Sequence, residues 1–163
     1  MKYNLQRFMD AQQEYYEIAK SELRNGKKES HYMWFMFPQI KGLGHSPMAE
    51  YYAIVDINEA RLYLQNSILK SHMNELLDIL LNLPCNDANE IFNYPDDMKL
   101  KSSMTLFKLA EPNNERFNKI LQKFYKGYLD EYTTQILEIQ KQKNEIHLQN
   151  DCIWCIICGE SLR

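Results

Sequence analysis

Two short segments of the chain, residues 31–47 and residues 95–107, hold most of the side chains that could do chemistry. The first surrounds two prolines and a Gly-x-Gly turn with aromatic rings and two histidines. The second places two aspartates, two lysines and three hydroxyl side chains close together. The candidate functional residues in these segments are His31, Trp34, Gln39, Asp97, Lys99, Ser102, Ser103 and Thr105. Such residue types are suited to binding a small polar ligand and to acid–base catalysis.

The second segment predicts an anion site at the start of a helix. If Asp96 caps a helix, the backbone N–H groups of residues 97–99 lack partners and attract anions. Lys99, Ser102 and Ser103 then share one helix face, where they could help to hold a phosphate or a carboxylate. A structural interpretation is also open: the acids stabilise the helix start, the lysines are solvated and the hydroxyls bond to their own helix.

The first segment offers an aromatic surface and two polar side chains. Trp34 carries a large apolar area, so it either packs in the core or stacks on a planar ligand. Gln39 needs hydrogen-bond partners if it is buried, and these come from the backbone or from the polar edge of a ligand. Imidazole side chains can act as acid or base near neutral pH, so we pair His31 with Asp97 as the candidate acid and base, although a single histidine is more often structural.

The chain has no standard catalytic or metal-binding motif. We find no nucleophile elbow, zinc-protease helix or Walker loop, and Gly-x-Gly alone is a weak nucleotide signal. The tail has two overlapping Cys-x-x-Cys steps at Cys152, Cys155 and Cys158, to which His147 or Cys85 could add a ligand. Because the second cysteine pair of a structural zinc site is missing, we expect neither metal nor cofactor. The tail is then an apolar segment packed on the body, or an extension with reactive thiols.

Composition indicates an ordinary globular domain. The 163 residues are 45% hydrophobic and 25% charged, close to the average for soluble proteins. A net charge of −3 gives no field that would attract nucleic acid or an anionic membrane. No apolar run reaches the roughly 20 residues of a membrane-spanning helix, and the first residues do not resemble a signal peptide. Four cysteines without a disulfide framework favour a cytoplasmic location.

The elements that must position these residues are helices. Few glycines and prolines interrupt the chain, and apolar residues mostly recur at helical spacing. We predict a mainly α, compact single-domain bundle of about seven or eight helices with little or no sheet. Helices are expected at residues 5–25, 47–53, 59–64, 68–83, 88–92, 97–110, 115–126 and 130–149, with an irregular segment or one short helix around Trp34. The expected caps are Asn4, Asn58, Asp87 and Asp96, and Tyr94-Pro95 predicts an extended link.

Several motifs follow one another along the chain. They are Tyr3-Asn4-Leu5-Gln6-Arg7-Phe8, Ser30-His31-Tyr32-Met33-Trp34-Phe35, Phe37-Pro38-Gln39-Ile40, Gly42-Leu43-Gly44, Pro95-Asp96-Asp97 and Ser102-Ser103-Met104-Thr105-Leu106-Phe107. This order resembles the bacterial family called domain of unknown function 1810, some members of which carry the misleading label calpastatin. The resemblance implies a helical domain over residues 1–137 and no established substrate. Residues 138–163 are left as a variable C-terminal helix and a cysteine-containing tail.

We hypothesise that the protein binds or processes a small anionic, nucleotide-like ligand in a pocket formed by residues 31–47 and 95–107. Trp34 would stack on the ligand, Gln39 would bind its polar edge, and Lys99 with the neighbouring serines would hold phosphate. The hypothesis requires that His31, Trp34 and Gln39 lie beside Asp97, Lys99 and Ser103.

Two other interpretations stay open. A non-enzymatic protein–protein interaction module predicts an exposed apolar patch in place of a pocket. In the third interpretation, both segments serve folding alone.

Overall fold

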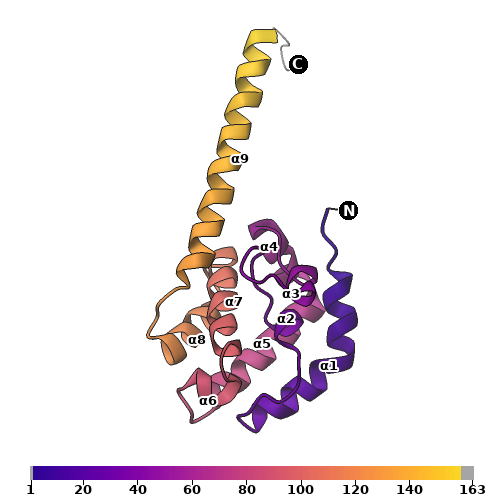
Figure 1. Cartoon of the computed structure of the whole chain (residues 1–163), viewed down its shortest axis with the longest axis vertical. Helices are drawn as coiled ribbons and strands as arrows, with labels where there is room; N and C mark the ends of the chain where they lie inside the picture. Colours follow the sequence, from indigo (N-terminus) through magenta and orange to yellow (C-terminus); the bar gives the residue numbers. More distant parts are fainter. Residues whose placement is uncertain (1, 159–163) are drawn as a thin grey trace.

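The structure, a computed structural model, describes the backbone of residues 2–158 and the side chains of residues 2–149. Over these residues the only β-structure is one isolated parallel bridge, between Ile40 and Ile54. The helices are α1 (Gln6–Arg24), α2 (Met33–Met36), α3 (Pro47–Tyr51), α4 (Ile57–Gln65), α5 (Ser67–Asn82), α6 (Ala88–Phe92), α7 (Asp96–Ala110), α8 (Glu115–Tyr125) and α9 (Glu131–Cys158). Helices α1 to α8 form one compact body, from which α9 projects (Figure 1). The predicted mainly α, single-domain fold is confirmed.

A row of aromatic rings joins four helices through the core. The ring centres of Phe8 in α1 and Tyr63 in α4 lie 5.2 Å apart, and Tyr63 lies at the same distance from Phe107 in α7. Phe107 in turn lies 5.8 Å from Phe117 in α8, and all four side chains are fully buried. Aromatic pairs at such distances stabilise a fold beyond the area that they bury. The row therefore fixes α1, α4, α7 and α8 relative to one another.

Two helices make most of the contacts that organise the body. Helix α5 packs against α1, α4 and α8, and α7 packs against α2, α4, α6, α8 and α9. The contact between α2 and α7 brings the two chemistry-bearing segments of the sequence together. Of the two alternatives for the segment around Trp34, the short helix is the one observed, as α2.

Side chains cap several of the helices. Of the four caps predicted from the sequence, only Asp87 is observed. Asp87 caps α6, as predicted, by accepting a hydrogen bond from the backbone N–H of Asn89 at 2.8 Å. The predicted cap Asn58 is wrong, because Asp56 caps α4 through the N–H of Glu59 at 2.9 Å. Helix α1 has no side-chain cap, so the prediction for Asn4 is also wrong.

The start of α7 differs from the prediction in two ways. Pro95 occupies the N-cap position and Asp96 is the first helical residue, because the Asp96 carboxylate is drawn to two ammonium groups instead. The predicted extended link is wrong as well, since Pro95 has ψ of 5° and its carbonyl accepts from the N–H groups of Met98 and Lys99, each at 3.1 Å. The Tyr94-Pro95 peptide bond is cis.

A buried ion pair holds the loop between α3 and α4. The Arg7 guanidinium lies 2.8 Å from the Glu59 carboxylate and donates to the carbonyls of Tyr51 and Ala53, both at 2.9 Å. Glu59 also accepts from the N–H of Val55 at 2.7 Å. A buried charge needs such partners, so Arg7 and Glu59 together fix the backbone at residues 51, 53 and 55. This loop includes Ile54, which forms the isolated β-bridge with Ile40 in the segment that follows Trp34.

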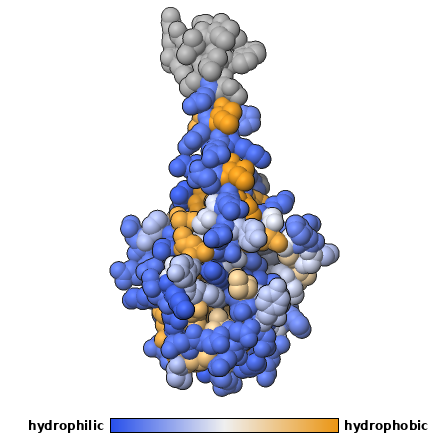
Figure 2. Space-filling model, turned by 60° about the vertical axis from the view of Figure 1, so that its left-hand side comes forward, coloured by the Kyte–Doolittle hydropathy of each residue, from blue (hydrophilic) through white to orange (hydrophobic). Residues whose placement is uncertain are grey.

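Helix α9 begins in the body and then leaves it. Asp130 caps its first turn by accepting from the backbone N–H of Thr133 at 2.9 Å and from its hydroxyl at 2.7 Å. Apolar, orange residues recur along the projecting part in Figure 2, among hydrophilic blue ones. The helix runs without a break across the expected boundary between residues 137 and 138. The side chains of Cys152, Cys155 and Cys158, and so the expectations for the tail, lie outside the described residues.

Among the described helices, none combines the length and the apolar character that crossing a membrane requires.

Candidate functional site

The two segments singled out in the sequence meet where α2 packs on α7. The ammonium group of Lys99 lies 5.2 Å from the centre of the Trp34 ring, within the range of a cation–π contact. Trp34 is half-buried, so the residue keeps some contact with solvent. The pair therefore joins an aromatic surface to a positive charge at the edge of the body.

One carboxylate is shared by two lysines next to Trp34. Asp96 lies 2.7 Å from the Lys28 ammonium and 3.0 Å from that of Lys99. The Lys28 side chain is only 6% exposed, and its ammonium also lies 5.1 Å from the centre of the Tyr32 ring. The cluster of Lys28, Lys99 and Asp96 thus holds two ammonium groups and one carboxylate.

Beside Trp34 lies a small hollow under Gln39. It is lined by Trp34, Gln39, Ile40, Gly42, Gly44, Ala49, Tyr52 and Ala53, and its volume is about 10 Å³. A space of this size holds about one water molecule, so no ring of a ligand enters it. The bridge fixes the backbone here, because Ile54 donates to the Gln39 carbonyl and Lys41 donates to the Ile54 carbonyl, both at 2.8 Å.

The proposed acid and base do not contact each other. His31 is exposed, and within the described residues its ring has no hydrogen bond. The Asp97 carboxylate accepts from its neighbour's backbone N–H, that of Met98, at 2.8 Å and from the Asn89 side chain at 3.3 Å. The structure therefore directs Asp97 toward α6 and gives His31 no partner for proton transfer.

The predicted anion cradle at the start of α7 is not formed. The N–H of Asp97 donates to the carbonyl of Asn93 at 3.0 Å, and the next two N–H groups donate to Pro95. Because these donors already have backbone partners, the first turn of α7 offers no free set of N–H groups to an anion.

The hydroxyls of α7 mostly serve the helix itself. Ser102 donates to the carbonyl of Met98 at 3.2 Å, and Thr105 donates to that of Lys101 at 2.8 Å. Thr105 also accepts from the N–H of Asp130 at 2.9 Å, which ties α7 to the start of α9. Ser103 is fully buried, and its hydroxyl has no partner in the described part of the chain. The structural interpretation thus describes Ser102 and Thr105.

A polar network between α1 and α5 was missed by the sequence analysis. The Gln12 amide nitrogen donates to the carbonyl of Phe35 and to the Tyr63 hydroxyl, both at 2.8 Å. The Gln12 amide oxygen lies 2.8 Å from Nδ1 of His72. The His72 ring stacks on Tyr16, with ring centres 3.7 Å apart and planes 12° from parallel.

This network determines the tautomer of His72. A backbone carbonyl can only accept, so the Gln12 nitrogen must face Phe35 and the Gln12 oxygen must face His72. His72 Nδ1 therefore carries the hydrogen, which leaves Nε2 as an acceptor in the neutral ring. Burial lowers the pKa of His72 below its ordinary value of 6.5, and Lys20 acts in the same direction. Glu75 and Glu17 oppose this shift.

His72 opens onto a groove of about 440 Å³ between α1 and α5. The groove is lined by Gln6, Met9, Asp10, Gln12, Gln13, Tyr16, Glu17, Ile68 and His72. The charged residues in this lining, Asp10 and Glu17, are both acidic. A sequence signal for the network existed, because Gln12 interrupts the buried face of α1 between Phe8 and Tyr16.

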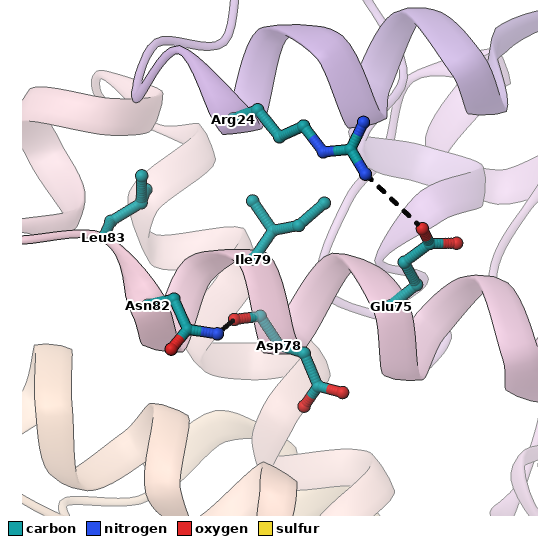
Figure 3. A pocket seen from close by; sticks show the side chains of 6 residues that line it. All are labelled: Arg24, Glu75, Asp78, Ile79, Asn82 and Leu83. Carbon is teal, nitrogen blue, oxygen red and sulfur yellow. Dashed lines mark hydrogen bonds and ion pairs between the residues drawn. The ribbon is translucent and has the colours of Figure 1, made fainter.

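A second hollow on the same seam, of about 500 Å³, is shown in Figure 3. There Arg24 of α1 points toward Glu75 of α5, with 3.8 Å between guanidinium and carboxylate. Glu75 also pairs with Lys20 at 2.6 Å, and Asp78 pairs with Arg116 at 2.8 Å. Its carboxylates are thus already engaged in ion pairs between helices, which favours a structural role.

Comparison with known proteins gives a family and a related fold. The family model described as protein of unknown function (DUF1810) matches residues 2–137. The crystal structure of the conserved hypothetical protein Rv1873 from Mycobacterium tuberculosis is similar, with a TM-score of 0.82 and 41% sequence identity. The similarity covers 85% of this chain and 99% of that one. Comparison with curated proteins gave no match. The chain therefore belongs to the DUF1810 family of proteins of unknown function.

Proposed function

We propose that this protein binds a small planar ligand with one anionic group, such as an aromatic carboxylate, on the surface around Trp34 and Lys99. The observation that carries the proposal is the contact between these two side chains, 5.2 Å from ammonium to ring centre. A half-buried indole provides a flat surface for a ring, and the adjacent ammonium provides an ion-pair partner.

The charges around Trp34 support an anion in preference to a neutral ligand. Asp96 balances only one of the two ammonium groups of Lys28 and Lys99. Lys99 is the more exposed of the two, at 25% against 6%, so it is the one that a ligand can reach. A carboxylate placed beside Lys99 would give its ammonium a second anionic partner besides Asp96.

The ligand class proposed here, a planar molecule with one anionic group, is more restricted than the nucleotide-like ligand expected from the sequence. Phosphate groups require several free donors, whereas the hydroxyls of Ser102 and Thr105 and the first N–H groups of α7 already have partners. The hollow beside Gln39 admits no ring, so the Gln39 amide contacts only the rim of a ligand. The proposed function is binding, without an assigned reaction.

Fluorescence titration tests the proposal in a Trp154→Phe background, where Trp34 is the single tryptophan. We expect benzoate or nicotinate to quench Trp34 saturably and the uncharged amides of the same rings to bind at least about tenfold more weakly. Lys99→Met should abolish this preference. Lys101→Met is the matched control, because that ammonium lies 6.0 Å from the Tyr125 ring and away from Trp34. Equal binding of acids and amides, or an unaltered Lys99→Met variant, contradicts the proposal.

A second candidate function is cation binding in the groove at His72. The observation in its favour is the acceptor Nε2, oriented by Gln12, in a groove whose charged lining residues are acidic. Methylguanidinium should shift the Nε2 resonance of His72 in a ¹⁵N NMR titration, and Glu17→Gln should weaken the effect. A resonance that does not respond excludes this function.

A further inference from the structure

A second groove adjoins the one at His72. It has a volume of about 450 Å³ and is lined by residues 2–6, by Met9 of α1 and by Leu62 of α4. Gln6 and Met9 line both grooves. The two grooves therefore meet at these residues, and we call the combined surface the α1 furrow.

The α1 furrow follows helix α1. At one end the Gln12 amide oxygen of α1 lies 2.8 Å from Nδ1 of His72, and at the other end Leu5 and Leu62 lie in the lining together. Met9 lies between Leu5 and Gln12 on α1 and lines both grooves. The rise from Leu5 to Gln12 is about 10 Å along a helix axis. The α1 furrow can therefore hold an elongated ligand.

Apolar side chains line the α1 furrow away from His72. Leu5 and Met9 are partly buried against the core, while Leu62 and Ile68 are 39% and 52% exposed. Each methylene group that such side chains shield from water raises the affinity of a ligand about fourfold. These side chains therefore favour a ligand with an apolar chain.

The His72 end of the α1 furrow is acidic. Asp10 and Glu17 line it, and neither takes part in an ion pair within the residues that the structure describes. Asp10 accepts one hydrogen bond, from the neutral amide of Gln6 at 2.7 Å, which leaves its charge uncompensated. Charge complementarity thus favours a cation at this end.

The opposite end of the α1 furrow carries the opposite charge. The charged residue in its lining is Lys2, whose ammonium lies 3.5 Å from the Asp56 carboxylate. A cation therefore gains more at the acidic end, where the carboxylates have no ammonium partner, than beside Lys2. This difference gives an amphiphilic cation one direction, with its charged group at His72 and its chain toward Leu62.

The polar groups at the acidic end match a guanidinium. Nε2 of His72 is an acceptor in the neutral ring, and in the described part of the chain the hydrogen bond of this ring is at Nδ1. A guanidinium presents several N–H groups in one plane, so it is suited to donating to Nε2 and to a neighbouring carboxylate at once. An ammonium ion is more strongly hydrated and has no such planar set of donors.

We propose that the α1 furrow binds a small amphiphilic cation, in which a guanidinium group ends a linear apolar chain of about eight carbons, comparable in length to the rise along α1. The guanidinium lies at His72, Asp10 and Glu17, and the chain passes Met9 and ends at Leu62. This inference rests on the second candidate function, cation binding at His72, and adds the chain and its direction to it.

Titration with methylguanidinium and with octylguanidinium, followed at the ¹⁵N resonance of His72 Nε2, tests the proposal. We expect both ligands to shift the resonance. Octylguanidinium should bind at least about 100-fold more tightly, since about half of its seven additional methylene groups leaving water gives this factor. Leu62→Ser should lower the ratio of the two affinities at least about tenfold. Leu148→Ser is the matched control, because it makes the same change at an exposed leucine of α9 outside the α1 furrow.

The results distinguish this inference from the function on which it rests. Equal affinities of the two ligands, with a His72 resonance that responds to both, would overturn the inference and leave cation binding at His72 in place. A resonance that responds to neither ligand would overturn both. An unchanged ratio in Leu62→Ser, or an equal fall in Leu148→Ser, would also overturn the inference, because the chain then lies elsewhere. Glu17→Gln should weaken both ligands, and a variant that weakens neither would contradict the position of the guanidinium.

Discussion

The ammonium of Lys99 lies 5.2 Å from the Trp34 ring centre, so the two segments with the most chemistry in the sequence form one surface. Asp96 holds Lys99 in place and joins it to Lys28 from a third segment. The contact thus depends on α2, on α7 and on the loop after α1.

Asp96→Asn should destabilise the protein more than Asp97→Asn. The first change leaves the buried Lys28 ammonium without its carboxylate, and removing one partner of such a pair costs about 3 kcal/mol of unfolding free energy. The second weakens two hydrogen bonds of the Asp97 carboxylate, neither of them to a charged group, which costs about 1 kcal/mol. Urea denaturation of both variants checks this, and equal losses would show that Asp96 has no special role.

Breaking the pair of Arg7 and Glu59 should cost about 3–5 kcal/mol with either Arg7→Met or Glu59→Gln, because the remaining polar group is buried. The double variant should lose less than the sum of the two single losses, since it leaves no uncompensated charge. Chemical denaturation of the four proteins measures the coupling. Additive losses would mean that the two side chains act separately.

Gly44→Ala should destabilise the loop around the hollow. A Cβ at position 44 would lie 2.6 Å from the Cβ of Ala49, so α3 must shift, at a cost of about 1–3 kcal/mol. Adding Ala49→Gly restores the space and should recover part of the loss despite the lower helix propensity of glycine. Thermal unfolding compares the three proteins. If adding Ala49→Gly lowers the stability of the Gly44→Ala variant further, a steric clash with Ala49 is not the cause of its destabilisation.

The pKa of His72 should lie below 6.5 in the folded protein, because burial disfavours the charged ring. The unfolded chain then binds the proton more readily, so the stability that this group contributes is complete above pH 6.5. It is lost as the pH falls from 6.5 through the folded pKa. Glu17→Gln should lower the pKa further, since Glu17 favours the charged form. NMR titration of the His72 ring protons measures this pKa. A pKa above 6.5 would contradict the conclusion that burial dominates the environment of His72.

Local rules in the sequence predicted most of the helices. Apolar spacing set the helices, and the turn after α1 at Gly26, with φ of 73°, follows from the freedom of glycine. The role of Asp96 was not predictable in this way. The Asp96 carboxylate can either cap its own helix or form an ion pair with Lys28. The ion pair forms only in the folded chain, because Lys28 is distant in sequence. The spacing of residues in the sequence does not show when a residue distant in the chain will compete for a side chain in this way.

The residues of the candidate site were also predictable only in part, because some of their contacts depend on residues distant in the sequence. The sequence located Trp34 and Lys99, and the contact of α2 with α7 joins them. It missed His72, because its significance depends on Gln12, which lies on a different helix. A polar residue inside the apolar face of α1 was the available signal, and its partner had no signal of its own.

The central claim, that Trp34 and Lys99 form one ligand surface, is tested most directly by a double-mutant cycle in benzoate binding. The cycle compares the natural sequence, Trp34→Leu, Lys99→Met and the double variant by calorimetric titration. We predict a coupling energy of at least about 1 kcal/mol, because both side chains contact the same ligand. Additive losses within about 0.5 kcal/mol, or no benzoate binding by the natural sequence, would contradict the claim.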